Sequence, residues 1–289
     1  MAAKPERTTM KHILVAAIAA TVAMPALADD VNVTIPFVAE IGGKPFSCTE
    51  SYPAMGSTGA DVTAIDFRMF VSNAAMIRAD GSRQPITLDQ DGQWQSGDVA
   101  LLDFEDASGG CTNGTPGTHA ALTGTVPAGE YTGIAFDVGI PFEENHVDPT
   151  LAPAPLNTTA MFWNWQGGYK FVRIDMVPAQ KAEGNEAAGW FLHLGSTMCD
   201  AASKTEAPTA CKNPNTLSLK VDGFDPAKNV LVVDPAPVVA DADLTVNAPE
   251  TSPGCMSFPD DGDCMTVMAK LGLPYMDVAA GQQSLITAR

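Results

Sequence analysis

The sequence contains none of the short motifs that mark the commonest catalytic sites. There is no G-x-S-x-G nucleophile elbow, no phosphate-binding loop of the form G-x-x-x-x-G-K-[ST], no G-x-G-x-x-G and no H-E-x-x-H. Cysteine pairs spaced C-x-x-C are absent too, so neither a zinc knuckle nor a thioredoxin-like redox pair is indicated. These absences remove the common enzyme classes, and we expect a protein that is not an enzyme.

Basic residues and long apolar runs are also scarce. The chain has 16 Lys and Arg against 34 Asp and Glu, a formal net charge of −18. Such acidity argues against nucleic acid and anionic membrane surfaces as partners and favours cationic ones, including metal ions. No segment after residue 28 offers roughly 20 uninterrupted apolar residues, so no membrane insertion is expected.

Residues 1–28 have the pattern of a secretory signal peptide. A basic start is followed by the apolar run Ile13–Ala23 and then by the small residues of Pro25–Ala28. The apolar run is too short to span a bilayer. We therefore expect export to the periplasm and a mature chain that begins near Asp29. Loss of three cations and one carboxylate with the signal peptide takes the formal net charge from −18 to −20.

All six cysteines lie in the mature chain, in a compartment that oxidises thiols. An even count predicts three disulfides, for which several pairings are possible. Short spacing favours Cys199–Cys211 and Cys255–Cys264 as local loops, which leaves Cys48–Cys111 as the third bond.

Short alternating segments separated by turn residues predict an all-β fold, an antiparallel β-sandwich with long disulfide-stapled loops and little helix. Clusters such as Ala79–Ser82 and Pro127–Gly129 supply the turns. The expected strands are Val31–Glu40, Asp61–Ala75, Val99–Phe104, Gly129–Gly139, Lys170–Val177, Gly189–Leu194 and Thr216–Val221.

The C-terminal segment has a different pattern. Apolar residues recur at helical spacing in 263–271, with Asp263 as the expected N-cap. The acidic run at 260–263 lacks the ligand spacing of an EF-hand and is expected to be a solvated turn. Pro274 and the polar stretch after it predict a loose tail. We divide the chain into a signal peptide (1–28), a β-sandwich domain (29–245) and a C-terminal extension with a short disulfide loop and a helix (246–289).

Two of the three mature histidines stand in informative contexts. His146 lies in a polar loop between prolines, directly after an apolar strand. His193 lies inside an apolar strand, where it shares a sheet face with Phe191 while its other neighbours take the opposite face. Each is either a structural histidine with a buried partner or a metal ligand, since imidazole is the commonest ligand for borderline metals. His119 is expected on the surface.

The segment Met161–Phe171 contains Trp163 and Trp165, which project to one side if the chain is extended. Core packing accounts for such a pair in a sandwich, and Gly167 and Gly168 predict local flexibility beside it. Five methionines could supply soft donors to Cu(I), although core filling is the expected role of each: Met161, Met198, Met256, Met265 and Met268.

An ordered set of segments between about Val31 and Val233 carries a resemblance to a known family. In the first half these are Phe46–Cys48, Asp66–Arg68, Trp94–Gln95, Val99–Glu105 and Cys111–Thr115. In the second half they are Gly139–Phe142, Asn145–His146, Pro155–Asn157, Met161–Phe171, His193–Ser196, Cys199 and Cys211. In this order they resemble the MbnP family, the methanobactin-associated copper-binding proteins also called the metallo-mystery-pair four-Cys family.

The resemblance implies a β-sandwich that binds one copper ion, as Cu(I), in the periplasm and serves copper homeostasis. It also implies a diheme partner of the cytochrome c peroxidase and MauG type, MbnH, which oxidises the first tryptophan of a W-x-W motif to kynurenine. The matching residue is Trp163, and His146 and His193 stand in the family's Asn-His and His-Leu-Gly segments as the accompanying ligands. Trp165 is then packing or an electron relay. We expect a monomer.

Kynurenine differs from tryptophan in the donors that it offers. The indole nitrogen is a poor donor because its lone pair belongs to the aromatic system, whereas kynurenine has an aniline nitrogen and a ketone. Oxidation of Trp163 would thus create a ligand. Coordination by a small number of neutral nitrogen donors suits Cu(I).

Two other classes of function stay open. In the first, His146, His193 and a carboxylate such as Asp148 bind zinc or iron in a metalloenzyme with a vacant position. In the second, a disulfide-stapled sandwich binds a small molecule or glycan on its tryptophans, Trp94, Trp163 and Trp165. Turnover would distinguish the first class, and affinity retained after histidine replacement would favour the second.

Overall fold

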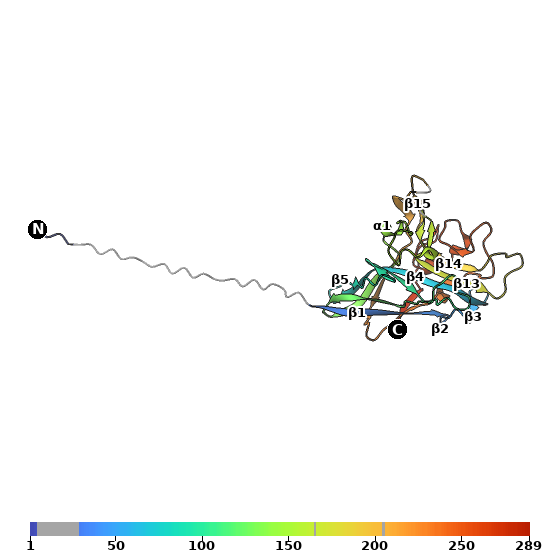
Figure 1. The fold of residues 1–289 in the computed structure, drawn as a ribbon, viewed down its shortest axis with the longest axis horizontal. Helices are drawn as coiled ribbons and strands as arrows, with labels where there is room; N and C mark the ends of the chain where they lie inside the picture. Colours follow the sequence, from blue (N-terminus) through green and yellow to red (C-terminus); the bar gives the residue numbers. More distant parts are fainter. Residues whose placement is uncertain (5–28, 165, 204–205) are drawn as a thin grey trace.

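The computed structural model describes residues 1–4, 29–164, 166–203 and 206–289. The predicted signal peptide, apart from its first four residues, lies outside the described residues, and so does Trp165. Among the described residues, a pair of large β-sheets pack against each other, and short helices and hairpins lie in the connections (Figure 1). The predicted all-β sandwich with little helix is confirmed. No helix among these residues has the length and hydropathy needed to span a bilayer.

The smaller sheet is built around the long strand β1. Its neighbour β9 runs antiparallel to it and its neighbour β18 runs parallel. In spatial order the strands are β20 (Ile286–Ala288), β18 (Leu231–Val233), β1 (Asp30–Ile41), β9 (Ala121–Pro127) and β6 (Thr87–Leu88), with β2 (Lys44–Pro45) paired to β1.

The larger sheet is built around β4. Its main order is β17 (Leu217–Asp222), β10 (Tyr131–Val138), β4 (Ala60–Arg78), β13 (Val172–Pro178), β14 (Trp190–Leu194) and β19 (Gly254–Cys255). The pairing of β14 with β19 is parallel. Also paired with β4 are β3 (Ser51–Met55), β5 (Arg83–Pro85) and β8 (Val99–Asp103), and β8 pairs with β7 (Gln95–Ser96).

The remaining elements are short and lie in the loops. Two hairpins are formed by β11 (Phe162–Asn164) with β12 (Gly168–Tyr169) and by β15 (Thr197–Asp200) with β16 (Ala210–Asn213). The helical turns are α1 (Phe142–Asn145), η1 (Thr159–Met161), α2 (Ala236–Val239), η2 (Gly262–Cys264) and α3 (Val267–Lys270).

All seven predicted strands form, each shifted by three residues or fewer at either end. A bulge in β4 decides which side chains reach the site. Asp66 faces Asp175 of β13, but the next pair is Ala64 with Met176, so one extra residue of β4 enters between them. Beyond the bulge Phe67 and Met69 face the core between the sheets, and Arg68 and Phe70 face outward.

A layer of loops covers that outward face and forms a second, smaller core. Its apolar cluster joins Phe70 and Leu101 of the sheet to Met161 and Tyr169 of the loops. In Figure 1, α1 and β15 lie on the side of β4 and β13 opposite to β1. The candidate site lies in this outer layer.

The three predicted disulfides are present: Cys48–Cys111, Cys199–Cys211 and Cys255–Cys264. The predicted loose C-terminal tail is wrong, because β20 pairs with β18 and buries Leu285 and Ile286. The extension also supplies β19 to the large sheet. A boundary at residue 245 stays a prediction.

The predicted helix at 263–271 is divided into η2 and α3. The carboxylate of Asp261, and not Asp263, caps η2 by accepting a hydrogen bond from the Asp263 N–H at 3.0 Å. Asp261 is 3% exposed, so the expectation of a solvated acidic turn is also wrong there. The Cys255–Cys264 bond links η2 to β19.

Candidate metal centre

His193 lies on the outer face of the large sheet, under the loop layer. Because side chains alternate along β14, Trp190, Leu192 and Leu194 enter the core. Phe191 and His193 face outward, as the sequence predicts. His193 is 5% exposed. The ring of Phe191 stacks on the imidazole with the centroids 5.7 Å apart.

Asp175 of β13 is the polar partner of His193, and the sequence pattern does not predict it. Its Oδ1 lies 2.6 Å from Nε2 of His193. The register places Arg173 opposite His193 and Asp175 opposite Phe191, so Asp175 is a diagonal neighbour on the same face. The alternation of Arg173 and Asp175 with apolar residues was a signal that both face one way. Their partner depends on strand register, which the alternation does not contain.

A chain of buried ion pairs leads inward from Asp175. Oδ2 of Asp175 accepts hydrogen bonds from Nε and Nη2 of Arg173 at 2.9 and 2.8 Å. Nε of Arg173 lies 3.1 Å from Asp66, which also holds Arg68 through two hydrogen bonds. Asp66, Arg68 and Asp175 are each 2% exposed or less. Buried charges are stable only when paired in this way.

This network determines the charge of the His193 pair. Burial is the largest influence on His193 and lowers its pKa, against the raising effect of its hydrogen bond to Asp175. Burial would raise the pKa of Asp175, but the hydrogen bonds and charges of His193 and Arg173 outweigh it and lower that pKa. At neutral pH the pair is therefore a neutral imidazole whose Nε2–H donates to an ionised carboxylate. Nδ1 of His193 is buried and has no hydrogen-bond partner among the described residues.

Trp163 lies beside His193 at the start of the β11–β12 hairpin. Its ring centroid is 6.3 Å from that of His193 and 5.6 Å from that of Phe258, which is 42% exposed. The hairpin turn is held by Asn164, whose Oδ1 accepts from the N–H groups of Gln166 and Gly167 at 2.9 and 2.8 Å. Trp163 is half-buried, so the indole is covered by the protein without being sealed from the surface.

Gly167 and Gly168 are closely packed against neighbouring residues, and their predicted flexibility stays a prediction. A Cβ on Gly167 would lie 3.3 Å from Cε3 of Trp163. A Cβ on Gly168 would lie 2.3 Å from the carbonyl oxygen of Asn145, and its φ of +73° favours glycine. These glycines let the Trp163 hairpin approach the His146 loop closely.

His146 follows α1 and is 5% exposed. Its neighbour Asn145 joins the loop to the rest of the site: Oδ1 accepts from the Tyr169 N–H at 2.9 Å, and Nδ2 donates to Ser196 Oγ at 3.3 Å. Because Tyr169 fixes the orientation of the amide, Nδ2 also faces Nε2 of His146, at 3.3 Å. Asn145 thus links His146 to the strand that follows Trp163 and to the segment that follows His193.

The Cys199–Cys211 hairpin borders the same site. Sγ of Cys211 lies 3.6 Å from Nε2 of His146. Within the described residues, two groups of three His, Cys or carboxylate side chains have donor atoms within 4.8 Å of one another, and each contains both sulfurs of a disulfide: His146 with Cys199 and Cys211, and Glu105 with Cys48 and Cys111. Thiolate is the ligand form of cysteine, so neither group is a complete site.

The three predicted ligands are therefore joined by one direct ring contact and by one indirect link. Trp163 and His193 are in ring contact. His146 is joined to both through Asn145, Gly167 and Ser196. Asp148, the carboxylate proposed for a metalloenzyme, instead accepts from the N–H and hydroxyl of Thr150 at 2.8 and 2.7 Å and closes a turn.

Two further expectations about single residues are corrected. His119 is half-buried: Nδ1 lies 2.7 Å from the Leu101 carbonyl oxygen, and the ring stacks on Trp94 at 5.6 Å. Burial lowers the pKa of His119. Core filling holds for Met161 and Met268, but Met198 is 53% and Met265 is 37% exposed.

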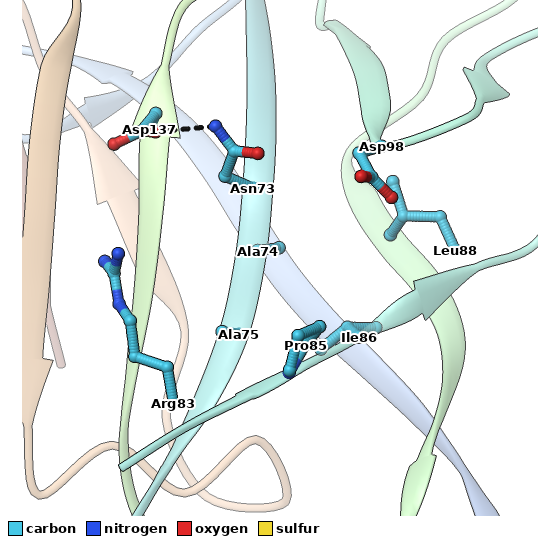
Figure 2. Close-up of a pocket in the computed structure, with 9 residues that line it drawn as sticks. All are labelled: Asn73, Ala74, Ala75, Arg83, Pro85, Ile86, Leu88, Asp98 and Asp137. Atoms are coloured by element: carbon cyan, nitrogen blue, oxygen red, sulfur yellow. Dashed lines mark hydrogen bonds between the residues drawn. The ribbon is translucent and has the colours of Figure 1, made fainter. Parts of the chain in front are cut away.

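A cleft lies elsewhere on the large sheet, between β4, β5 and β10 (Figure 2). Its volume is about 300 Å³, and two of its lining residues on adjacent strands are joined, because Asn73 of β4 donates a hydrogen bond to Asp137 of β10 at 2.8 Å. Its lining residues include none of the predicted ligands, so the cleft is separate from the candidate site.

The fold and the site together define a class: a disulfide-stapled β-sandwich with a buried, carboxylate-linked histidine beside a tryptophan in its outer layer. The sequence model of the family MbnP matches residues 30–257, and the chain belongs to this family. It is a methanobactin-associated protein. The chain is similar to the solved structure of MbnP from Methylosinus trichosporium, with 31% identity and a TM-score of 0.80 over 90% of this chain and 98% of that one. A search of curated protein sequences finds no match.

Proposed function

We propose that the chain holds one Cu(I) ion in the periplasm through His146, His193 and a kynurenine derived from Trp163. The observation that supports this most is the pair Trp163 and His193: the indole contacts a neutral imidazole whose buried Nδ1 has no partner among the described residues. A buried polar atom without a partner is costly, and a metal ion would supply one. The residues present thus fit a soft, low-coordinate ion.

Each of the three residues has a role in this proposal. His193 presents a neutral nitrogen, which Cu(I) accepts as a ligand. Oxidative cleavage of the C2–C3 bond of Trp163 by the partner adds one oxygen atom to each carbon and gives N-formylkynurenine. Water then hydrolyses the formamide and C2 leaves as formate, so that an aniline nitrogen and a ketone remain. His146 comes from the loop that Asn145 ties to the same region. Copper, when bound, supplies soft coordination chemistry for storage or transfer, and the chain is not an enzyme.

The oxidant in this proposal is a diheme partner of the MbnH type. Trp163 is half-buried and its neighbour Phe258 is exposed, so a partner protein can approach the indole without unfolding the sandwich. The signal-peptide pattern at the N-terminus supports action in the periplasm. The high net negative charge favours a cation as cargo.

The alternative metalloenzyme has weaker support, because Asp148 is engaged with Thr150 and the carboxylate beside His193 is Asp175, itself held by Arg173. The alternative binding sandwich needs free aromatic faces. One face of Trp94 is already covered by His119.

Replacement of Trp163 by Phe tests the proposal. We expect the Trp163→Phe variant, produced with the partner, to fold, because most of the aromatic bulk is retained, but to lose its copper on dialysis. Trp94→Phe is the matched control, since Trp94 stacks on His119 and is not a proposed ligand, and it should keep its copper. Metal content after dialysis is the measurement. A Trp163→Phe variant that retains one copper per chain would exclude the kynurenine ligand.

A further inference from the structure

The hydrogen bond between Asp175 and His193 determines more than the charge of the pair. It occupies one ring nitrogen of His193 and leaves the other available. We propose that Asp175 is the residue that positions His193, and that Nδ1 of His193, not Nε2, is the ligand atom. This inference rests on the proposed copper site and specifies how the chain prepares it.

Nε2 of His193 is excluded as the ligand atom by its hydrogen bond to Asp175. It lies 2.6 Å from Oδ1 of Asp175, and both side chains are buried. Binding of a metal at Nε2 would break this bond and leave one carboxylate oxygen buried without its donor, which costs more than the loss of an exposed hydrogen bond. Binding at Nδ1 leaves the hydrogen bond intact and uses the ring atom that has no partner among the described residues.

The ring is also prevented from turning over. Phe191 stacks on it with an interplanar angle of 12°. The backbone of His193 is held by the pairing of β14 with β13 and by Ser257, whose Oγ donates to the His193 carbonyl oxygen at 2.8 Å. A 180° turn about the Cβ–Cγ bond would place Cε1 instead of Nε2 beside Asp175, so it would break this hydrogen bond and disturb the stacking on Phe191.

Asp175 is itself held in place by charge. Its Oδ2 accepts from two nitrogens of Arg173, and Asp66 fixes Arg173 from the other side. One oxygen of the carboxylate is thus committed to Arg173 and the other to His193. Metal-bound histidines in proteins commonly donate their second nitrogen to a carboxylate, and loss of that carboxylate weakens metal binding about 10–100-fold.

The replacement Asp175→Asn makes the positioning role measurable. An amide has one acceptor oxygen, and the charged Arg173 competes for it more strongly than His193 does. The amide N–H₂ would then face His193 and donate to Nε2, which moves the ring proton to Nδ1. The analogous change in the serine protease triad leaves the geometry intact but stabilises the wrong tautomer. A protonated Nδ1 has no lone pair to offer copper, so binding would require the less stable tautomer and would be weaker.

Nitrogen-15 NMR of the copper-free protein tests the assignment directly. In the wild-type protein we expect a protonated Nε2 and an unprotonated Nδ1 for His193, and addition of Cu(I) should shift the Nδ1 resonance. In Asp175→Asn the protonation of the two nitrogens should be reversed, and copper affinity measured by chelator competition should fall about 10–100-fold. Asp148→Asn is the matched control, because that carboxylate binds Thr150, and it should match the wild type.

The outcomes separate this inference from the proposed function. Copper bound by a wild-type protein whose Nδ1 carries the proton, or wild-type affinity in a folded Asp175→Asn variant, would overturn the positioning role alone. A wild-type protein that binds no copper after co-expression with the partner would overturn both. The wild-type NMR measurement needs no variant, so it stands even if Asp175→Asn does not fold.

Discussion

At the residue scale, Gly195 explains how Trp163 can lie so close to the end of β14. A Cβ at this position would come within 2.5 Å of Cζ3 of Trp163 and 2.7 Å of the Tyr169 carbonyl oxygen. The indole therefore occupies the space that any other residue would fill. The carbonyl of Gly195 accepts from Nδ2 of Asn215 at 2.8 Å, which holds the backbone in place.

Replacement of Gly195 by alanine should displace Trp163 and lower copper retention. Overpacking a closely packed position costs about 1–3 kcal/mol, so we expect a modestly destabilised but folded protein with less copper after dialysis. The control is Gly262→Ala, where the nearest atom to a new Cβ is 3.5 Å away. Full copper occupancy in Gly195→Ala would show that the position of the indole does not matter for the site.

Single residues were predictable when their environment follows from alternation along a strand. The outward orientation of the His193 side chain is such a case. Asp175 was missed because its contact with His193 depends on the register of two strands. His119 and Asp261 were misjudged for a similar reason: their burial comes from Trp94 and Tyr275, which are distant in sequence.

At the element scale, strands with strong apolar alternation were predictable and short or weakly apolar ones were not. β9 was missed because Thr and Gly interrupt its pattern, although its pairing with β1 extends from Asp30 to Pro36 of that strand. The parallel pairings of β18 and β19 join segments far apart in the chain, and nothing local specifies them.

The hairpins and turns that build the site were the least predictable elements. The sequence indicated a segment of aromatic residues at Met161–Phe171 but not the Asn164 turn that folds it. The two-residue strand β12 is defined by its contact with Asn145 as much as by its pairing with β11. Such elements derive their stability from tertiary contacts, which local propensity does not report.

At the scale of the whole molecule, the chain buries several of its many carboxylates. Burial raises the pKa of Asp103 to about 7, from an ordinary value of 3.8. In the folded state Asp103 therefore keeps its proton at pH values where the unfolded chain has lost it. The stability that this proton contributes is complete below about pH 4 and is lost as the pH rises to about 7.

The variant Asp103→Asn should remove this pH dependence. We expect the free energy of unfolding of the copper-free wild type to decrease by about 1–4 kcal/mol, relative to the variant, between about pH 4 and pH 7. Because other carboxylates contribute with the opposite sign, the difference between the two proteins is the informative quantity. Denaturant unfolding at several pH values measures it, and a constant difference would mean that Asp103 is ionised in the fold throughout.

At the same scale, the proposed export and the proposed diheme partner belong to one proposal, in which oxidation of Trp163 creates the copper site. The most direct measurement is the copper content and intact mass of the chain purified from the periplasm, made with and without the diheme partner. With the partner, we predict one copper per chain and the net exchange of one carbon for one oxygen in the Trp163 peptide. Without it, we predict neither. One tightly held copper in a chain whose Trp163 is unmodified would contradict the account.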